Sequence, residues 1–221
     1  MKINIFFLYT SLLSFFLVLS CERTSTQELS LTLEEKAKKA LETFKELITE
    51  DTYDQLGFKT VSEKTQIALG ERIPFYHIGF DQIQNFEKDH NPNDLLNHQA
   101  EYFFPVLVED SIRSSISFKN YDGIWKTAQY GRSNFTKAIA IVRAEQAKEH
   151  QKGHDEYFAI HIPALYLIFI SHFEEDVLMM RPVYEDDRIG LISSETLPAT
   201  EALSQVSEYA DIHKGGLKKI E

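Results

Sequence analysis

Cysteine is nearly absent from this sequence, because Cys21 carries the only thiol among 221 residues. One thiol excludes an intramolecular disulfide and a Cys-x-x-Cys metal or redox site. The familiar catalytic motifs are missing as well: there is no G-x-S-x-G elbow, no G-x-x-x-x-G-K-S/T loop, no G-x-G-x-x-G turn and no S-x-x-K. These absences exclude the recognised versions of those chemistries, but they do not exclude enzymes of other kinds.

The chain has fewer basic than acidic residues. The chain has 23 Lys and Arg residues against 34 Asp and Glu residues, which gives a formal net charge of -11. No basic cluster or stripe interrupts this balance along the sequence, so binding to nucleic acid through counterion release is not expected. The same balance predicts repulsion from anionic lipid headgroups, so a charged face is not expected to hold the protein on a membrane.

The longest apolar run lies at the N-terminus, where Lys2 precedes an uncharged segment from Ile3 to Ser20. A charged start followed by an apolar middle is typical of an export signal. The run ends in Val18, Leu19 and Ser20, and Cys21 follows directly before a polar stretch. In this arrangement residues 1–21 resemble the lipobox signal of bacterial lipoproteins.

The resemblance implies that Cys21 receives a diacylglycerol on its sulfur and that cleavage falls between Ser20 and Cys21, with acylation of the new amino terminus. Each buried methylene contributes about 0.8 kcal/mol, so two or more chains would hold the protein on a bilayer. The rest of the chain would then lie outside the cytoplasm, in the bacterial cell envelope. Two alternatives stay open: an uncleaved signal anchor, since about 18 apolar residues can span a bilayer, and an ordinary cleaved signal.

The remaining sequence predicts one globular domain. We expect a signal peptide over residues 1–20, a lipidated tether over 21–31, a single α+β domain over 32–216 and a tail over 217–221. A chain of this size buries enough surface to fold without disulfides or metals. A change of pattern near residues 131–133 offers a possible seam between two subdomains.

Hydrophobic periodicity gives the expected elements. Helices are predicted over 32–49, from 133 toward Gly153 and over 197–212, with a weaker one over 62–69. Strands are predicted over 74–78, 102–108, 112–118, 124–131, 157–162, 164–171 and 177–183. The sequence therefore predicts an α+β fold, with an antiparallel or mixed sheet built from two meanders and helices packed on it. The alternation of Ser115 and Ser117 with Ile116 and Phe118 predicts that one sheet face is open to water.

Four residues are candidates for ligand binding. His161 and His172 lie in predicted strands and, with His77, would suit metal binding or proton transfer if they met beside a carboxylate; histidines packed in the core or on a sheet face are the alternative. Arg181 interrupts an apolar strand. If its side chain faces inward, it needs a carboxylate, either internal or on a ligand; an outward-facing or internally paired arginine is the alternative. Trp125 adjoins a predicted turn and is either a contact residue or part of the core.

His150 and His154 have the spacing of two metal ligands on one helical turn, but Gln151 stands where a zinc motif has its glutamate and Gly153 is a helix stop. We read this stretch as a solvated helix end. The sequence predicts no metal site and no cofactor.

Two classes of function remain. One is a non-catalytic binding or assembly module, held at the membrane by its N-terminal lipid, whose acidic domain meets an envelope protein partner or a small ligand. The other is a hydrolase that assembles a histidine and carboxylate pair from distant strands. Convergence of His161, His172 and Arg181 with an acid in one pocket would favour the hydrolase. Dispersed positions and an aromatic surface near Trp125 would favour the binding module.

Overall fold

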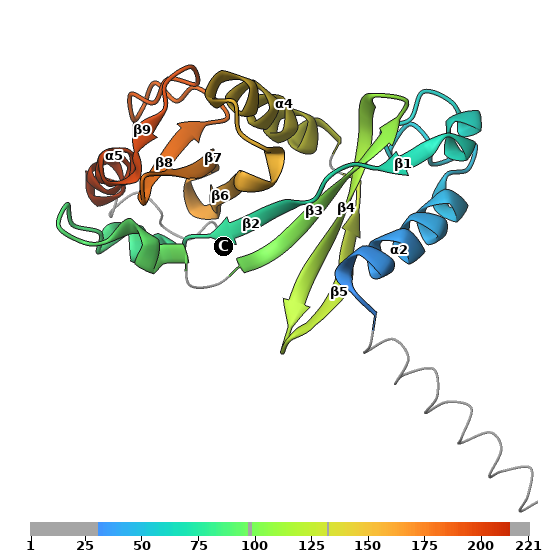
Figure 1. Ribbon diagram of the computed structural model, residues 1–221, viewed down its shortest axis with the longest axis horizontal. Helices are drawn as coiled ribbons and strands as arrows, with labels where there is room; N and C mark the ends of the chain where they lie inside the picture. The colour runs from blue at the N-terminus through green and yellow to red at the C-terminus, as the bar shows by residue number, and fades with distance from the viewer. Residues whose placement is uncertain (1–30, 97–98, 132, 213–221) are drawn as a thin grey trace, which may run out of the picture.

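The computed structural model describes residues 31–96, 99–131 and 133–212, in which all the features below are found. The predictions for the signal peptide, for Cys21 and for the tail over 217–221 concern residues outside these ranges. Figure 1 shows the helices and strands along the chain, coloured from the N-terminus to the C-terminus.

Four α-helices occur in the described ranges: α2 (Leu33–Leu47), α3 (Phe80–Gln84), α4 (Ser133–His150) and α5 (Ala199–Ile212). The strands are β1 (Ile67–Leu69), β2 (Ile73–His77), β3 (Gln99–Val108), β4 (Ser111–Tyr121), β5 (Ile124–Tyr130), β6 (Phe158–Ile162), β7 (Leu167–Glu174), β8 (Val177–Pro182) and β9 (Leu197–Pro198). The helix predicted over 32–49 and the two strand groups therefore form close to their expected positions.

All the strands belong to one nine-stranded sheet in the order β5-β4-β3-β2-β6-β7-β8-β9, with β1 paired to β3. The meanders β3-β4-β5 and β6-β7-β8 are antiparallel, whereas β2 and β6 pair in parallel. The predicted α+β class, with a mixed sheet built from two meanders, is confirmed. The two meanders, which lie on either side of residues 131–133 in the sequence, belong to the same sheet because β2 pairs with β6.

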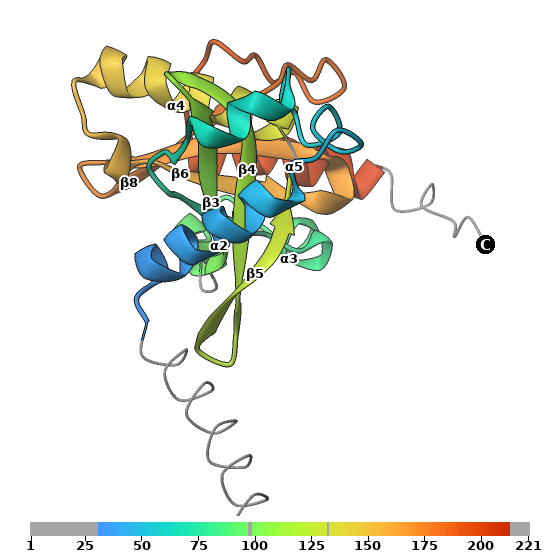
Figure 2. The same ribbon diagram turned by 90° about the vertical axis from the view of Figure 1, so that its right-hand side faces the viewer.

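The helices cover both faces of the sheet. On one face α4 packs over its middle, where Ile139 and Val142 meet Phe75, Phe103 and Ile170. On the opposite face α2 covers β3 to β5, and α5 with α3 covers β6 to β8. Figure 1 shows β3 and β4 running between α4 and α2, and Figure 2 shows α2 crossing in front of these strands.

Helix α2 begins where the sequence predicts. The Thr32 hydroxyl accepts a hydrogen bond from the Glu35 backbone N–H at 3.2 Å, and the Glu35 carboxylate accepts one from the Thr32 N–H at 2.8 Å. This capping box satisfies two backbone donors that the first turn leaves unpaired. The hydrogen bond from the Thr32 backbone also lowers the pKa of the Glu35 carboxyl. The apolar face of the helix, including Ala37, Leu41 and Phe44, is buried against the sheet.

The prediction that one sheet face is open to water is wrong for β4. Ser115 and Ser117 are buried, because α4 packs against this face of β3 and β4. The Ser115 hydroxyl donates a hydrogen bond to the Gly131 carbonyl, which satisfies it inside the protein. Small polar residues in a strand predict a solvated face, but here their small side chains let α4 pack closely against the sheet.

Two predicted elements also differ. The weak helix over 62–69 is instead a 3₁₀ turn at Val61–Thr65 followed by strand β1. Strand β7 begins only at Leu167, because Pro163–Leu165 forms a 3₁₀ turn that ends with Tyr166 in the left-handed conformation at φ 58°. Helix α3 and the short strand β9 had no clear sequence signal.

Candidate ligand-binding site

A pocket of about 430 Å³ lies between α2 and β5. Its lining residues are Leu31, Lys36, Lys39, Ala40, Thr43, Phe118, Ile124, Trp125, Lys126, Thr127 and Tyr130. Leu31, which lies two residues before the first residue of α2, is one of them. The volume of the pocket is in the range of about 300–1,000 Å³ that is usual for small-molecule sites.

Helix α2 contributes one stripe of side chains to this pocket. Lys36, Lys39, Ala40 and Thr43 are spaced three and four residues apart, which places them along one line of the helix surface. The stripe borders the buried face formed by Ala37, Ala40, Leu41 and Phe44. The floor of the pocket is therefore apolar on the α2 side, and its rim carries ammonium groups.

A β-bulge decides which side chains of β5 face α2. Phe118 pairs with Thr127, but Ser117 pairs with Gln129, so Ala128 is an extra residue without a partner in the ladder. The extra residue reverses the alternation beyond it. Tyr130 consequently lies on the same face as Thr127 and stacks on Phe44 of α2, with ring centroids 5.0 Å apart.

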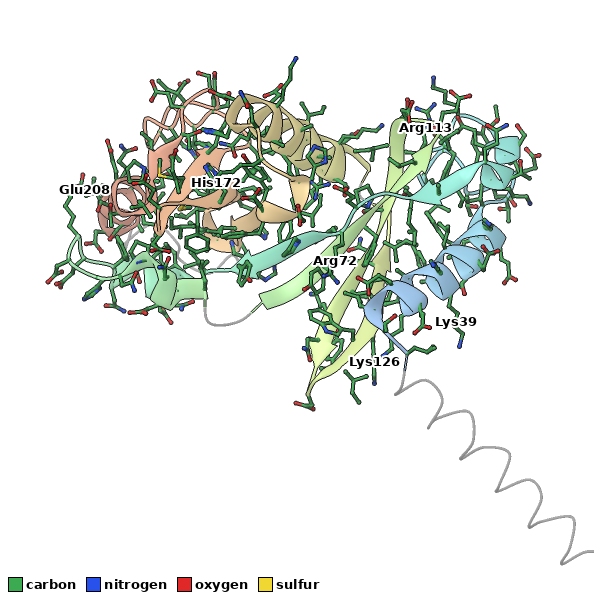
Figure 3. All side chains as sticks on the ribbon, in the orientation of Figure 1. Lys39, Arg72, Arg113, Lys126, His172 and Glu208 are labelled. Carbon is green, nitrogen blue, oxygen red and sulfur yellow. The ribbon has the colours of Figure 1, made fainter. Side chains whose placement is uncertain are left out.

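The pocket carries positive charge, whereas the whole chain carries a net negative charge. Lys36, Lys39 and Lys126 are among the lining residues of the pocket, and no acidic residue in the described part of the chain is, although the protein has a net charge of -11. Lys39 projects from α2 and Lys126 from β5 (Figure 3). The Lys36 ammonium donates to the Trp125 backbone carbonyl at 3.2 Å, which holds this cation at the pocket. The sequence missed this group of lysines because its members come from two separate elements.

Tyr130 supplies a neutral hydroxyl. Burial raises its pKa above the usual value of 10, and the hydroxyls of Thr43 and Thr127 lie against the phenol. The phenol therefore stays protonated near neutral pH, and three hydroxyl groups are gathered where α2 and β5 approach each other.

The structure places Trp125, a predicted contact residue, in the pocket wall. Its ring is half-buried and tilts against Tyr102 of β3, with centroids 4.8 Å apart. The Arg72 guanidinium lies over the Tyr102 ring at 5.0 Å and also pairs with Glu34 of α2. Trp125 thus belongs to the edge of the core and to the pocket at the same time.

A second pocket, near α3, has the opposite charge. It measures about 690 Å³ and is lined by Asp81, Gln82, Asn85, Phe86, Asp89, His90, Asn91, Asp94 and Leu95. Glu87, Asp89 and His90 form the one group in the described residues whose ligand atoms lie close enough together to share a metal ion. All three are exposed, and the His90 Nδ1 accepts the Glu87 backbone N–H. We assign no metal to this group.

His161 does meet His77, as the sequence allowed. The two residues are register partners on the parallel strands β2 and β6, and their ring centroids are 5.3 Å apart. Phe75 and Phe135 pack against the His161 ring. Both histidines are half-buried on the face that α4 covers.

His172 lies elsewhere on that face. His161 pairs with Ile168 of β7, four residues before His172, which corresponds to roughly 13 Å along the strand. His172 is fully buried, and neither of its ring nitrogens has a hydrogen-bond partner among the described residues. Its ring packs against those of His150 and Tyr157 at 4.9 and 5.0 Å. His150 is therefore half-buried at the end of α4, whereas Gln151, Gly153 and His154 are exposed, so the solvated helix end that the sequence predicted is wrong for His150 alone.

Burial dominates the titration behaviour around His172. It lowers the pKa of His172 to about 4, and the nearby Lys152 ammonium acts in the same direction. Burial also raises the pKa of Tyr157 to about 12, while its hydroxyl donates to the Gln146 carbonyl at 3.1 Å. Both groups are neutral near pH 7, so this cluster is a packed part of the interior.

Arg181 finds its carboxylates on the chain itself, on two exposed side chains of α4. Its guanidinium pairs with Glu145 at 3.0 Å and Glu149 at 3.3 Å, both on α4, and donates to the Ser193 carbonyl at 2.7 Å. The side chain is 11% exposed. Arg181 thus ties β8 to α4 and to the connection before β9.

The predicted site residues are therefore dispersed. His161, His172 and Arg181 line neither of the two pockets described above, and only Trp125 does. Figure 3 shows His172 in the half of the molecule away from Lys39 and Lys126. The lysine spacing in α2 was a usable sequence signal, whereas the contribution of Tyr130 depends on the bulge.

Comparison with known proteins gives no match to a family model, to a curated protein or to a solved structure. Within the described ranges, no helix combines the length and the apolar character needed to cross a bilayer.

Proposed function

We propose that this protein is a lipid-anchored lipoprotein of the bacterial cell envelope whose domain is a non-catalytic binding module, with the α2–β5 pocket as its ligand site. The pocket is the observation that carries the proposal, because its lining residues include an apolar floor, three lysines and one tryptophan. Such a combination of apolar surface and a few polar groups is typical of small-molecule sites.

The place of the pocket fits an anchored protein. If Cys21 carries the lipid, the ten residue-to-residue steps from Cys21 to Leu31 extend at most roughly 35 Å. Leu31 lines the pocket, so the ligand would be taken up close to the bilayer surface. The dispersal of His161, His172 and Arg181 supports a binding module over the alternative hydrolase, which needs these groups together.

The test is native mass spectrometry of the full chain after gentle detergent extraction of envelopes. Thr43 is exposed on α2 and lines the pocket, so Thr43→Trp should fill the pocket without disturbing the core. The matched control is Thr49→Trp, at an exposed position beyond the end of α2 and outside the pocket.

We expect a bound small molecule on the wild type and on Thr49→Trp, and its loss from Thr43→Trp with an unchanged unfolding temperature. The same bound species on all three proteins would place the ligand elsewhere. A preparation without any ligand that hydrolyses ester or amide substrates would overturn the binding module in favour of the hydrolase.

A further inference from the structure

The chemistry of the pocket indicates which ligands it takes. We infer that the α2–β5 pocket binds an organic anion: a carboxylate or phosphate carried on an apolar body. The inference rests on the proposed binding function and adds the class of ligand.

The anion is recognised by the lysines. Lys36 and Lys39 of α2 and Lys126 of β5 are among the residues that line the pocket, and no acidic residue of the described ranges is. An ammonium group has three N–H donors, and the Lys36 bond to the Trp125 carbonyl uses one of them. Hydrogen bonds from ammonium to carboxylate or phosphate are stronger than neutral ones. A cationic ligand would meet like charges from these lysines.

The apolar body is recognised by the opposite wall. Phe118 lies at the base of the pocket, and Ile124 and Trp125 form its β5 side. Inorganic phosphate would leave this surface in contact with water, whereas an acyl chain or a flat ring would cover it and gain the free energy of apolar burial. The wall therefore selects an amphiphile over a simple ion.

The hydroxyls of Thr43, Thr127 and Tyr130 complete the polar part of the site. Because they carry no charge, they hydrogen-bond either end of a carboxylate or phosphate ester without repelling it. A pocket of about 430 Å³ holds a small molecule or one lipid headgroup, and not a folded partner.

Two sources could supply this chemistry: a soluble organic acid, and the headgroup of an anionic phospholipid beneath the anchored domain. Both present an anion on an apolar body. The experiment separates them by offering one probe in solution and the other in the bilayer.

Trp125 is the single tryptophan of the chain, so its fluorescence reports on the pocket alone. We would reconstitute the full chain in phosphatidylcholine vesicles and titrate it with octanoate, with octylammonium as the cationic match and octanol as the neutral one. A parallel set of vesicles would contain phosphatidylglycerol and no soluble probe.

The expected result is a saturable change in Trp125 emission with octanoate or with phosphatidylglycerol, and none with octylammonium or octanol. A response to octanoate identifies a soluble acid, and a response to phosphatidylglycerol identifies the lipid headgroup. In the doubly substituted Lys36→Gln, Lys39→Gln protein, binding should weaken at least about fivefold, the effect of two partly exposed ion pairs. The control Lys88→Gln, Lys148→Gln removes the same charge from exposed positions outside the pocket and should bind as the wild type does.

An equal response to octylammonium or octanol would overturn the anionic ligand while leaving a binding pocket in place. The absence of any response in either vesicle set would also overturn it. In that case, a ligand lost on Thr43→Trp in the mass-spectrometry test would leave the proposed function standing, and the lack of such a ligand would remove both.

Discussion

The imidazoles of His150 and His172 lie 4.9 Å apart, centroid to centroid, where the end of α4 packs against β7. His172 is fully buried, and Tyr157 closes the other side of its ring at 5.0 Å. Each histidine has a buried ring nitrogen without a partner among the described residues. Protonation of His172 would therefore place an uncompensated charge in the interior.

This burial predicts an acid-sensitive fold. The pKa of His172 is about 4 in the native protein and about 6.5 when unfolded, so between these values the unfolded chain binds the extra proton. The contribution of His172 to stability is complete above pH 6.5 and is lost as the pH falls toward 4. We expect this loss to reach about 3 kcal/mol, measured by urea unfolding at pH 7 and pH 4.

The variant His172→Leu isolates this effect, because leucine is apolar and does not titrate. It should lose about 3 kcal/mol less than the wild type between pH 7 and pH 4. His90→Gln, at an exposed position, should keep the pH dependence of the wild type. Equal losses in wild type and His172→Leu would show that His172 does not control the acid response.

We expect the ion pairs of Arg181, whose guanidinium is nearly buried although its partner carboxylates are exposed, to contribute more to stability than the pair of Lys45 with Glu42. Glu145→Gln combined with Glu149→Gln would leave the nearly buried guanidinium with only the Ser193 carbonyl of its present partners. We expect the free energy of unfolding to fall by about 1–3 kcal/mol. Glu42→Gln breaks the more exposed pair with Lys45 and should cost less than about 0.5 kcal/mol. Equal costs in the two denaturation experiments would contradict the structural role of Arg181.

The packing of Tyr130 predicts that its ring contributes more to stability than its hydroxyl does. Tyr130→Ala removes the stacking on Phe44 and should lower the free energy of unfolding by about 2–4 kcal/mol. Tyr130→Phe keeps the ring and should cost less than about 1 kcal/mol, since it loses only the contacts with Thr43 and Thr127. Chemical denaturation measures both variants. A costly Tyr130→Phe would mean that the hydroxyl, and not the stacked ring, holds β5 to α2.

The lipid anchor is tested separately at Cys21. Cys21→Ala removes the sulfur to which the lipid would be attached, so we expect an unprocessed precursor and no incorporation of labelled palmitate. Gel mobility and radiolabel measure the two effects, with Ser20→Gly as a control that keeps a small residue at the cleaved bond. Normal maturation of Cys21→Ala would contradict the lipoprotein assignment.

Much of the fold could be predicted because its signals are local. The capping box of Thr32 and Glu35 and the apolar spacing of Ala37, Leu41 and Phe44 mark α2 within a single turn or two. The two meanders follow from alternating strands and short turns. The strand neighbours β2 and β6 could not be predicted, because more than 80 residues separate Phe75 from its partner Ala159.

The candidate site was harder to predict, because it depends on which faces meet. Simple alternation along β5 would put Tyr130 on the face opposite Trp125, and only the extra residue Ala128 brings both toward α2. The burial of Ser115 beneath α4 was missed for a related reason, since a small polar residue carries no signal of what covers it.

By itself, the sequence determined the elements, the acidic balance, the absence of disulfide chemistry and the α+β class, all of which depend on composition and on contacts near in the chain. Only the tertiary structure decided which charged and titratable side chains lie close together. It gave Arg181 two carboxylates of α4, separated His161 from His172, and brought β5 beside the lysines of α2. Strand register and helix packing set these distances, and both depend on pairings between residues far apart in the sequence.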